Sequence, residues 1–300
     1  MHRRSFLYGT GIMAGAGLLA QKKALASLFP MADYNIKMLR NNVGTFTERG
    51  GTIGFLLSPD SIIVIDAQFP DTAPHFIAEA KKRSQQPFRY LLNTHHHGDH
   101  TSGNIAFKGL AEHVLAHENS LANQKRVADS QNSVDKQLFP DITFSDETKI
   151  KLPKDKIKGY YYGRGHTNGD AMYHLEDANI VHMGDLMFNR RHPFVDRSAG
   201  ANMQSWIEVL DKATKKFDKD TIYIFGHAQT GYSETGKADD LKKFADYLTK
   251  VLVFAKQEIK AGKTKEEFVK NTSIPGVTEW QGDGIERPLT AAYEEVLAGQ

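Results

Sequence analysis

Short apolar runs separated by turn residues dominate the first two thirds of the chain, and this pattern predicts β-strands. The runs TIGFLL and SIIVIDA are separated by Ser58, Pro59 and Asp60, which favour a turn, so the pair predicts a β-hairpin. The expected strands cover residues 52–57, 61–67, 89–94, 113–117, 157–163, 171–176, 179–185 and 221–227.

Apolar residues at helical spacing predict helices between and after these strands. Trp206, Val209 and Leu210 form one such stripe, and Thr264 with Glu267 forms a capping box at the start of a short helix. Because strands and helices are mixed along the chain, the pattern predicts a layered α/β protein. The longer expected helices cover residues 72–82, 118–128, 202–217 and 238–261.

Composition narrows the class of protein. The chain has 300 residues, of which 40% are hydrophobic and 25% charged, an ordinary make-up for a globular protein. Its formal net charge of +2 gives no reason to expect nucleic acid as a partner, so a small molecule is favoured. Oligomeric state is left open. The absence of cysteine excludes disulfides, thiolate ligands and a cysteine nucleophile, so any bound metal must be held by nitrogen and oxygen.

The N-terminal segment has the pattern of an export signal. Paired Arg3 and Arg4 precede a moderately apolar, glycine-containing run, and small residues end at Ala26. The segment resembles a bacterial twin-arginine signal cleaved after Ala26, although His2 and Tyr8 depart from that pattern; a Sec-type signal or an uncleaved tether is the alternative. The run is short for a membrane span, so we expect no stable membrane anchor and a periplasmic or exported protein. The expected organisation is a signal at 1–26 and one domain at 27–300 with a helical C-terminal segment at 236–300.

The stretch LLNTHHHGDHTSGN places a dense group of histidines directly after an expected buried strand. His95 and His97 would face the same way if strand geometry continued, whereas His96 would point to the other side and tolerate replacement. Asp99 and His100 follow a glycine that lets the chain turn back. A polar loop is the alternative, but so charge-dense a cluster would cost stability unless something binds it.

Three further candidate ligands end later strands, namely His166, Asp185 and His227. Imidazole and carboxylate groups suit zinc, and three protein ligands with a water are typical of a catalytic site. By spacing, one ion would take His95, His97 and His166, the other would take Asp99, His100 and His227, and Asp185 would bridge them. Two Zn²⁺ per chain are expected, with iron or manganese as alternatives. Isolated histidines are usually structural, so no role is assigned to His113, His117, His174 and His182.

The run His95-x-His97-x-Asp99-His100, the later GHT ending at Thr167, the GD ending at Asp185 and the GH ending at His227 together resemble the metallo-β-lactamase superfamily. The resemblance implies an αββα sandwich of two mixed β-sheets flanked by helices, with a dinuclear site at one edge. It also implies that Asp66 supports the histidine ligands, and Thr167 is assigned to the same supporting group.

The ligand set then selects among activities of this superfamily. Aspartate at Asp185 resembles the glyoxalase II and lactonase branches, whereas tri-histidine β-lactamases usually have serine there. The favoured function is a dinuclear zinc hydrolase in which a metal-bridging hydroxide attacks the carbonyl of an ester, thioester, lactone or β-lactam, with Asp99 orienting it. The alternatives are a tri-histidine β-lactamase, a mononuclear iron persulfide dioxygenase and a non-catalytic metal-binding protein.

Substrate contacts are expected from loops near the ligands. Tyr162 ends a run of tyrosines before His166, and Asn189, Arg190 and Arg191 follow Asp185. Arginines there could meet a substrate carboxylate. Exposed arginines on a mobile loop are the alternative, and the C-terminal helices are expected to pack on the domain rather than form a lid.

Overall fold

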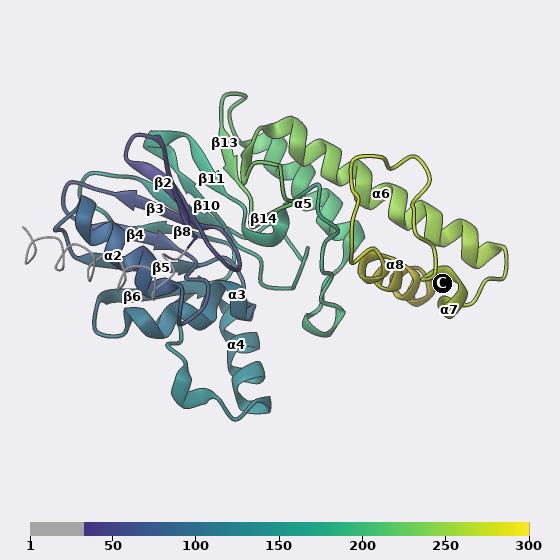
Figure 1. Cartoon of the computed structure of the whole chain (residues 1–300), viewed down its shortest axis with the longest axis horizontal. Helices are drawn as coiled ribbons and strands as arrows, with labels where there is room; N and C mark the ends of the chain where they lie inside the picture. The colour runs from purple at the N-terminus through teal and green to yellow at the C-terminus, as the bar shows by residue number, and fades with distance from the viewer. Residues whose placement is uncertain (1–32, 300) are drawn as a thin grey trace, which may run out of the picture. The chain divides into compact units, whose positions relative to one another are not determined.

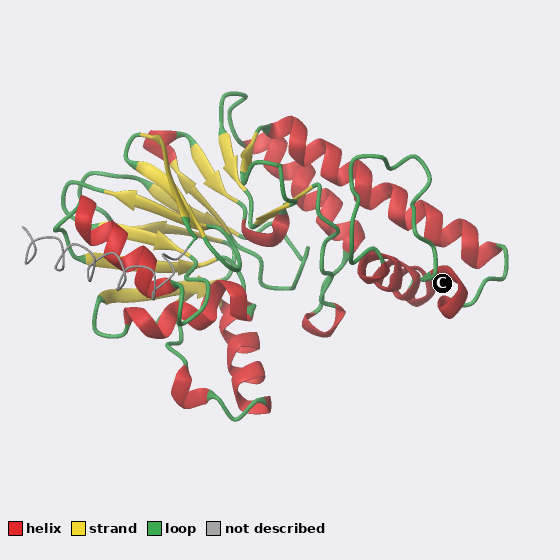
Figure 2. Ribbon diagram, viewed as in Figure 1, coloured by secondary structure: helices red, strands yellow, loops and turns green. Residues whose placement is uncertain are grey.

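The computed structural model describes residues 33–299 of the chain. The predicted export signal lies outside the described residues. From Asn35 onward the chain forms one unit in which strands pair mainly into two large sheets (Figures 1 and 2). Within residues 33–299, no helix combines the length and apolar character needed to cross a membrane.

The first sheet changes from antiparallel to parallel at its centre. Strands β1 to β4 are antiparallel neighbours in chain order, and β4 to β7 are parallel. All four residues of β4 are buried, which explains why its sequence IIVI is uniformly apolar. The strands are β1 (Asn35–Arg40), β2 (Val43–Thr47), β3 (Ile53–Leu57), β4 (Ile62–Ile65), β5 (Phe88–Asn93), β6 (Ala111–His117) and β7 (Ile142–Phe144).

The second sheet is also mixed, because β11 pairs in parallel with β13 whereas its other pairs are antiparallel. Its order is β15-β13-β11-β10-β9-β8. A short parallel pair, β12 with β14, lies beside the site described below. These strands are β8 (Glu147–Ile150), β9 (Ile157–Tyr160), β10 (Met172–Leu175), β11 (Ile180–His182), β12 (Phe188–Asn189), β13 (Ile222–Ile224), β14 (His227–Ala228) and β15 (Thr235–Gly236).

The two sheets face each other across a shared apolar core. Ile63 and Ile65 of β4 belong to the same buried cluster as Tyr173 and Ile180 of the second sheet. The alternate residues of β4 point to the other face of the first sheet. On that outer face, the ring of Phe76 from α2 lies 5.6 Å from that of Phe46 and 5.5 Å from that of Phe55.

Helices cover the outer face of the second sheet as well. Trp206 and Phe244, from α5 and α6, share a buried cluster with Val181 and Met183. The layers are therefore helix, sheet, sheet and helix, so the predicted αββα sandwich is confirmed (Figure 2). The helices are α2 (Ala73–Arg83), α3 (Gly98–Thr101), α4 (Glu118–Ser130), α5 (Met203–Lys216), α6 (Ala238–Lys260), α7 (Lys265–Phe268) and α8 (Glu286–Ala298).

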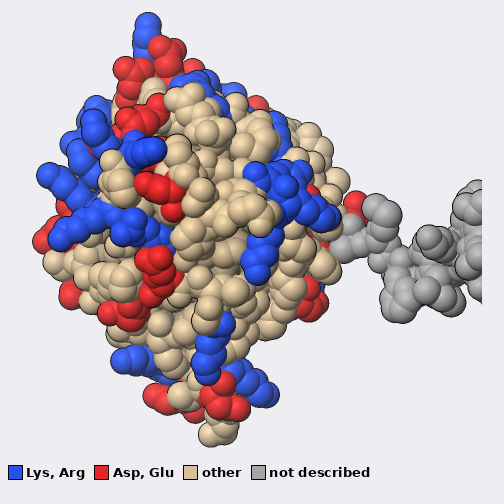
Figure 3. Space-filling view, turned by 90° about the vertical axis from the view of Figure 1, so that its left-hand side faces the viewer, with Lys and Arg blue, Asp and Glu red and all other residues tan. Residues whose placement is uncertain are grey.

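Each expected strand and helix has a counterpart, usually within one to three residues at its ends. The capping box also forms, because Thr264 accepts from the backbone of Glu267 and the Glu267 carboxylate accepts from that of Thr264. Strands β1, β2, β7, β8, β12 and β15 were missed because their sequences lack a marked apolar run. On the face shown in Figure 3, basic and acidic side chains are interspersed rather than sorted into fields of one sign.

Candidate metal centre

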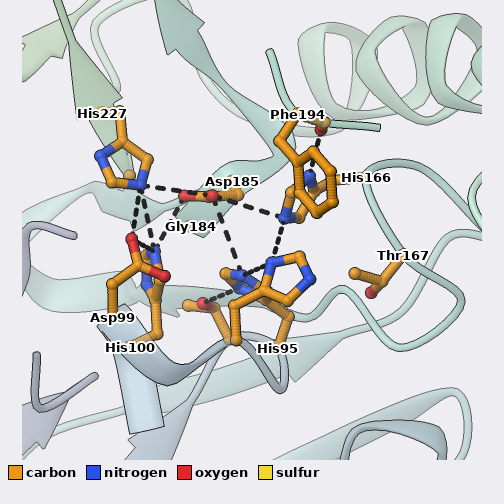
Figure 4. Close-up of polar contacts among 12 residues, drawn as sticks. His95, Asp99, His100, His166, Thr167, Gly184, Asp185, Phe194 and His227 are labelled. Atoms are coloured by element: carbon orange, nitrogen blue, oxygen red, sulfur yellow. Dashed lines mark hydrogen bonds and ion pairs between the residues drawn. The ribbon is translucent and has the colours of Figure 1, made fainter. Parts of the chain in front are cut away.

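The predicted ligands lie in the segments that follow β5, β9, β11 and β13. The stretch after β5 carries His95, His97, Asp99 and His100, and His227 begins β14. His166 lies in the loop between β9 and β10, and Asp185 lies in a short 3-10 turn after β11. Because these segments meet at one edge of the sandwich, residues from distant parts of the chain become neighbours (Figure 4).

The local path of the His95–His100 stretch differs from the expected strand geometry. Residues 94–96 form bends after β5 ends at Asn93, and His97 has an extended backbone at the N-terminus of α3. The amides of His100 and Thr101 both donate to the carbonyl of His97, which closes the turn. His95 and His97 do converge, but a bend followed by a helical turn brings them together rather than strand alternation.

The first ligand group consists of three imidazoles. His97 Nδ1 lies 3.2 Å from His95 Nε2 and 2.7 Å from His166 Nε2. Asp185 Oδ2 completes the group at 3.4 Å from His166 Nε2 and 3.8 Å from His95 Nε2. These four residues offer ligand atoms close enough to surround a single metal ion.

The second group lies on the opposite side of Asp185. His227 Nε2 is 3.1 Å from Asp99 Oδ2 and 3.4 Å from His100 Nε2. Asp185 reaches this group too, with Oδ1 3.0 Å from His100 Nε2 and Oδ2 3.4 Å from His227 Nε2. Asp185 thus lies between the two groups, in the position that the sequence analysis predicted for a bridging ligand (Figure 4).

The backbone around Asp185 leaves no room for larger residues. A Cβ on Gly226 would lie 2.0 Å from Asp185 Oδ1, so only glycine fits before His227. Trp206 of α5 is fully buried and donates from Nε1 to the carbonyl of Leu186 at 3.0 Å. Helix α5 therefore fixes the turn that carries Asp185.

Hydrogen bonds to the outer nitrogens show that the first group suits a cation. Nδ1 of His166 must donate to the carbonyl of Phe194, at 2.6 Å, and Nε2 of His97 donates to Asp196 at 2.9 Å. Each neutral ring then turns a lone pair inward, and the two inward nitrogens are only 2.7 Å apart. Burial, followed by the nearby His97, lowers the pKa of His166 to about 3, so a proton is not favoured between them. A metal ion fits this donor set.

The second group also calls for positive charge. Burial would lower the pKa of His100, but Asp185, Asp99 and Asp66 raise it well above its usual range. Burial likewise opposes the charge on His227, and Asp185 and Asp99 still raise its pKa. The carboxylates behave in the opposite sense: despite burial, His227 and His100 hold the pKa of Asp185 well below its usual range. Two carboxylates and two imidazoles thus form a set that is neutralised only by protons or by a bound cation.

Asp66 lies in the supporting position that the resemblance implies. Its Oδ2 accepts from Nδ1 of His100 at 2.7 Å and from the hydroxyl of Thr94, also at 2.7 Å. The Thr94 hydroxyl in turn lies 3.0 Å from Nδ1 of His95. Asp66 is fully buried, so one carboxylate orients a histidine in each group, directly for His100 and through Thr94 for His95.

Thr167 acts on the loop rather than on a ligand side chain. Its amide and hydroxyl both donate to Asp170, at 2.8 and 2.6 Å, and Figure 4 shows it apart from the ligand contacts. Burial raises the pKa of Asp170 to about 7. The Thr167–Asp170 pair therefore shapes the turn that follows His166.

The expected substrate contacts fall mostly outside the cavity at the metal centre. Tyr162 lies two residues after the end of β9. Its ring packs beside that of Tyr160, with the ring centroids 5.6 Å apart. Asn189 donates to the carbonyl of Ser233, and Arg190 forms ion pairs with Asp240 and Glu279. Their side chains are thus engaged elsewhere.

The cavity beside the ligands has a volume of about 330 Å³. Its wall includes Arg191, which was a candidate substrate contact from the sequence. Four other wall residues were not among those candidates. His192 and Phe194 lie in the loop after β12, which sequence proximity to Asp185 could have suggested, whereas nothing in the sequence linked Arg287 of α8 to the site. Besides the ligands and Gly98, the cavity is lined by Phe188, Arg191, His192, Phe194 and Arg287.

His96 is not a member of the first group, but it is buried beside it. It is 5% exposed, and its Nε2 lies 3.6 Å from Asp196 Oδ2. Together with His97 and Asp196 it forms a further group with spacing suitable for a metal ion. The expectation that His96 tolerates replacement therefore stays a prediction, with burial against it.

Comparisons with known proteins agree with this fold and show the family of the chain. The family model described as the metallo-β-lactamase superfamily matches residues 46–227, so the chain belongs to that superfamily. A metallo-β-lactamase type 2 from Elizabethkingia meningoseptica is 21% identical over 65% of this chain and 79% of its own length. A hydroxyacylglutathione hydrolase from Brucella anthropi is 29% identical over 50% of this chain and 52% of its own length.

Among solved structures, a metallo-β-lactamase from Pontibacter korlensis superposes with a TM-score of 0.59. It is 18% identical, and the superposition covers 72% of this chain and 99% of that one. That likeness supports the fold. The family match and the hydrolase relatives confirm the prediction of a metal-dependent hydrolase of this superfamily.

Proposed function

We propose that the chain is a dinuclear zinc hydrolase that cleaves an ester, thioester, lactone or β-lactam of a small molecule. The observation that carries this proposal is the position of Asp185, whose two oxygens face both ligand groups. His95, His97 and His166 would hold one ion, and Asp99, His100 and His227 the other. When bound, zinc lowers the pKa of a water and polarises a carbonyl oxygen, which is the chemistry that this hydrolysis requires.

The chain's own residues supply orientation and exclude water from one side of the site. Asp99 is the more accessible carboxylate, with a side chain 30% exposed against 4% for Asp185. Although burial opposes it, His100 and His227 lower the pKa of Asp99, so it is ionised and can accept a hydrogen bond that orients the attacking water at the cavity. Phe188 and Phe194 line the same cavity and exclude water from one side of the site.

Two alternatives make different use of the site. A mononuclear iron dioxygenase would need the first group and leave the second without purpose, although Asp99, His100 and His227 are brought together from separate elements. A tri-histidine β-lactamase usually lacks the aspartate that here contacts both groups. Because the relatives include both metallo-β-lactamases and hydroxyacylglutathione hydrolases, the test compares substrates with different leaving groups.

Metal analysis of the protein as purified tests the proposal. We expect about two zinc ions per chain and cleavage of one class among nitrocefin, a lactone, a thioester and a carboxylic ester. One iron per chain with oxygen uptake would support the dioxygenase instead. A metal-loaded protein that turns over no member of the panel would favour metal binding alone.

Export is part of the same proposal. The twin-arginine-like segment predicts a mature periplasmic chain that begins after Ala26. Mass spectrometry of the chain from a periplasmic extract should give that N-terminus. Replacement of Arg3 and Arg4 by lysine should retain the full-length chain in the cytoplasm, and unchanged export of that variant would contradict a twin-arginine signal.

A further inference from the structure

We propose that Arg191 and Arg287 bind an anionic group of the substrate, so that the site favours small molecules carrying a carboxylate. This inference rests on the proposed hydrolase function and names its substrate class. Both arginines line the cavity that also contains His97, Asp99, His166, Asp185 and His227. Arg287 is the second residue of α8, beyond residues 46–227 that the superfamily model covers. Arg287 is therefore a cavity residue that comes from the C-terminal helices and not from the region matched by the superfamily model.

The acidic groups of this cavity do not neutralise the arginines. Its two carboxylates are Asp99 and Asp185, and both face the ligand histidines. Among residues 33–299, no ion pair is found for Arg191, and the one found for Arg287 joins its Nε to Glu286 Oε1 at 3.8 Å. Arg287 and Glu286 are 53% and 56% exposed, so water screens this contact and leaves the guanidinium end available.

The neighbouring Arg190, in contrast, is neutralised by two ion pairs. Its side chain is 7% exposed, and its two terminal nitrogens lie 3.1 Å from Asp240 and 3.1 Å from Glu279. Its guanidinium also lies 5.1 Å from the ring centroid of Trp280. Arg191 follows it directly and is exposed. Arg190 is thus held in ion pairs within the fold, whereas Arg191 lines the cavity.

Part of the cavity lining is apolar, because Phe188 and Phe194 are among its residues. Phe188 is stacked on His227 with ring centroids 5.3 Å apart, and the ring of Phe194 lies 5.5 Å from that of His97. Phe194 is 44% exposed, so its ring is accessible to a ligand in the cavity. A substrate with an apolar body and an anionic end matches a cavity lined by both phenylalanine and arginine side chains. Arginine is well suited to the anionic end, because its planar donors can bind both oxygens of a carboxylate.

The cavity of about 330 Å³ is near the small end of ligand sites in proteins, which span roughly 300–1,000 Å³. We therefore choose a compact pair of test substrates, 3-acetoxybenzoate and 3-acetoxybenzamide. They share the same acetyl ester and differ in the charge of a group that cannot reach its own ester. The corresponding phenols, 3-hydroxybenzoate and 3-hydroxybenzamide, serve as ligands that are not hydrolysed.

The first experiment measures kcat and KM for both esters, with the zinc-loaded protein. The ratio of kcat/KM for the anionic ester to that for the neutral ester should fall about tenfold in Arg191→Ala and in Arg287→Ala, the size of one exposed charge-assisted contact. The loss should lie mainly in KM. Glu286→Gln should raise the ratio, because it removes the carboxylate that competes for Arg287. Arg89→Ala is the matched control, since Arg89 is paired with Glu112 on the first sheet and is not among the cavity residues.

The second experiment measures binding without turnover, by calorimetry of the two phenols. The preference for 3-hydroxybenzoate should decrease by a similar factor in both arginine variants, and it should decrease with added salt in the unaltered protein. An unchanged preference in both variants would overturn the inference while ester cleavage leaves the hydrolase proposal intact. Arginine-dependent binding without cleavage of any ester, thioester, lactone or β-lactam would support the inference and contradict the hydrolase proposal.

Discussion

Nε2 of His97 donates a hydrogen bond to Oδ2 of Asp196 at 2.9 Å, and this contact determines which nitrogen of His97 faces the other ligands. Asp196 is itself fixed, because its Oδ1 accepts from the hydroxyl of Ser198 and the amide of Ala199. The carboxylate thus keeps the proton of His97 on the outer nitrogen. Nδ1 is left free to bind a metal ion.

Asp196→Asn should therefore weaken metal binding with little change of shape. The amide would retain an oxygen for Ser198 and Ala199 but present a donor to His97, whose proton would then move to Nδ1. We expect a loss of about 10–100-fold in affinity for one ion, the usual effect of removing such a support. Titration against a chelator measures it. Ser198→Ala leaves the carboxylate in place and serves as the control; equal affinities in both variants would contradict the role of Asp196.

The pKa shifts predict that acid releases the two ions in sequence. The raised pKa values of His100 and His227 mean that these ligands take up protons at higher pH than usual, so protons displace their ion first as the pH falls. Burial lowers the pKa of His95 and lowers that of His166 to about 3, so these two ligands stay deprotonated to lower pH. Zinc content measured after equilibration at decreasing pH should fall from about two to about one before reaching zero.

The variant His227→Ala identifies which ion leaves first. It should start with about one zinc per chain and lose it only in the later, more acidic step. Loss of both ions from the unaltered protein in a single step would contradict the prediction. So would a His227→Ala protein that loses its remaining ion in the earlier step.

Much of the metal centre was accessible from the sequence because its ligands follow apolar runs directly. The end of a buried strand can be located from its pattern, and His95, His97, Asp99 and His100 come immediately after one. The same reasoning placed His166, Asp185 and His227 near them. How His95 and His97 come together was predicted wrongly, because the backbone bends at residues 94–96 instead of continuing as a strand. Bends at polar positions leave no periodic signal in the sequence.

Residues that act from a distance were not accessible. Asp196 and Arg287 reach the site through loop and helix packing, and neither sits in a motif or at a strand end. Arg190 and Arg191 are adjacent and chemically identical in the sequence. Only the positions of Asp240 and Glu279, on and beyond α6, show that one is structural and the other faces the cavity.

Asp99→Ala should abolish turnover while preserving the fold. Its side chain is 30% exposed and contacts the ligand histidines rather than the apolar core, so the change in the free energy of unfolding should be within about 1 kcal/mol. Loss of the carboxylate that orients the attacking water should lower kcat by about 10²–10⁴-fold, and loss of a ligand should lower the zinc content as well. Rate measurements at saturating zinc separate the two effects. Turnover equal to that of the unaltered protein under those conditions would contradict the role of Asp99.

Arg190→Ala should destabilise the protein, whereas Arg191→Ala should leave its stability nearly unchanged. Removing Arg190 leaves Asp240 and Glu279 without their partner and removes the guanidinium beside Trp280. Loss of a buried pair typically costs 3–5 kcal/mol, but both acids are partly exposed, so we expect about 2 kcal/mol. Arg191 is exposed with no ion pair found in residues 33–299, and its removal should change stability by less than about 0.5 kcal/mol. Urea unfolding at equal zinc content measures both; a larger loss for Arg191→Ala than for Arg190→Ala would reverse the assignment of the two residues.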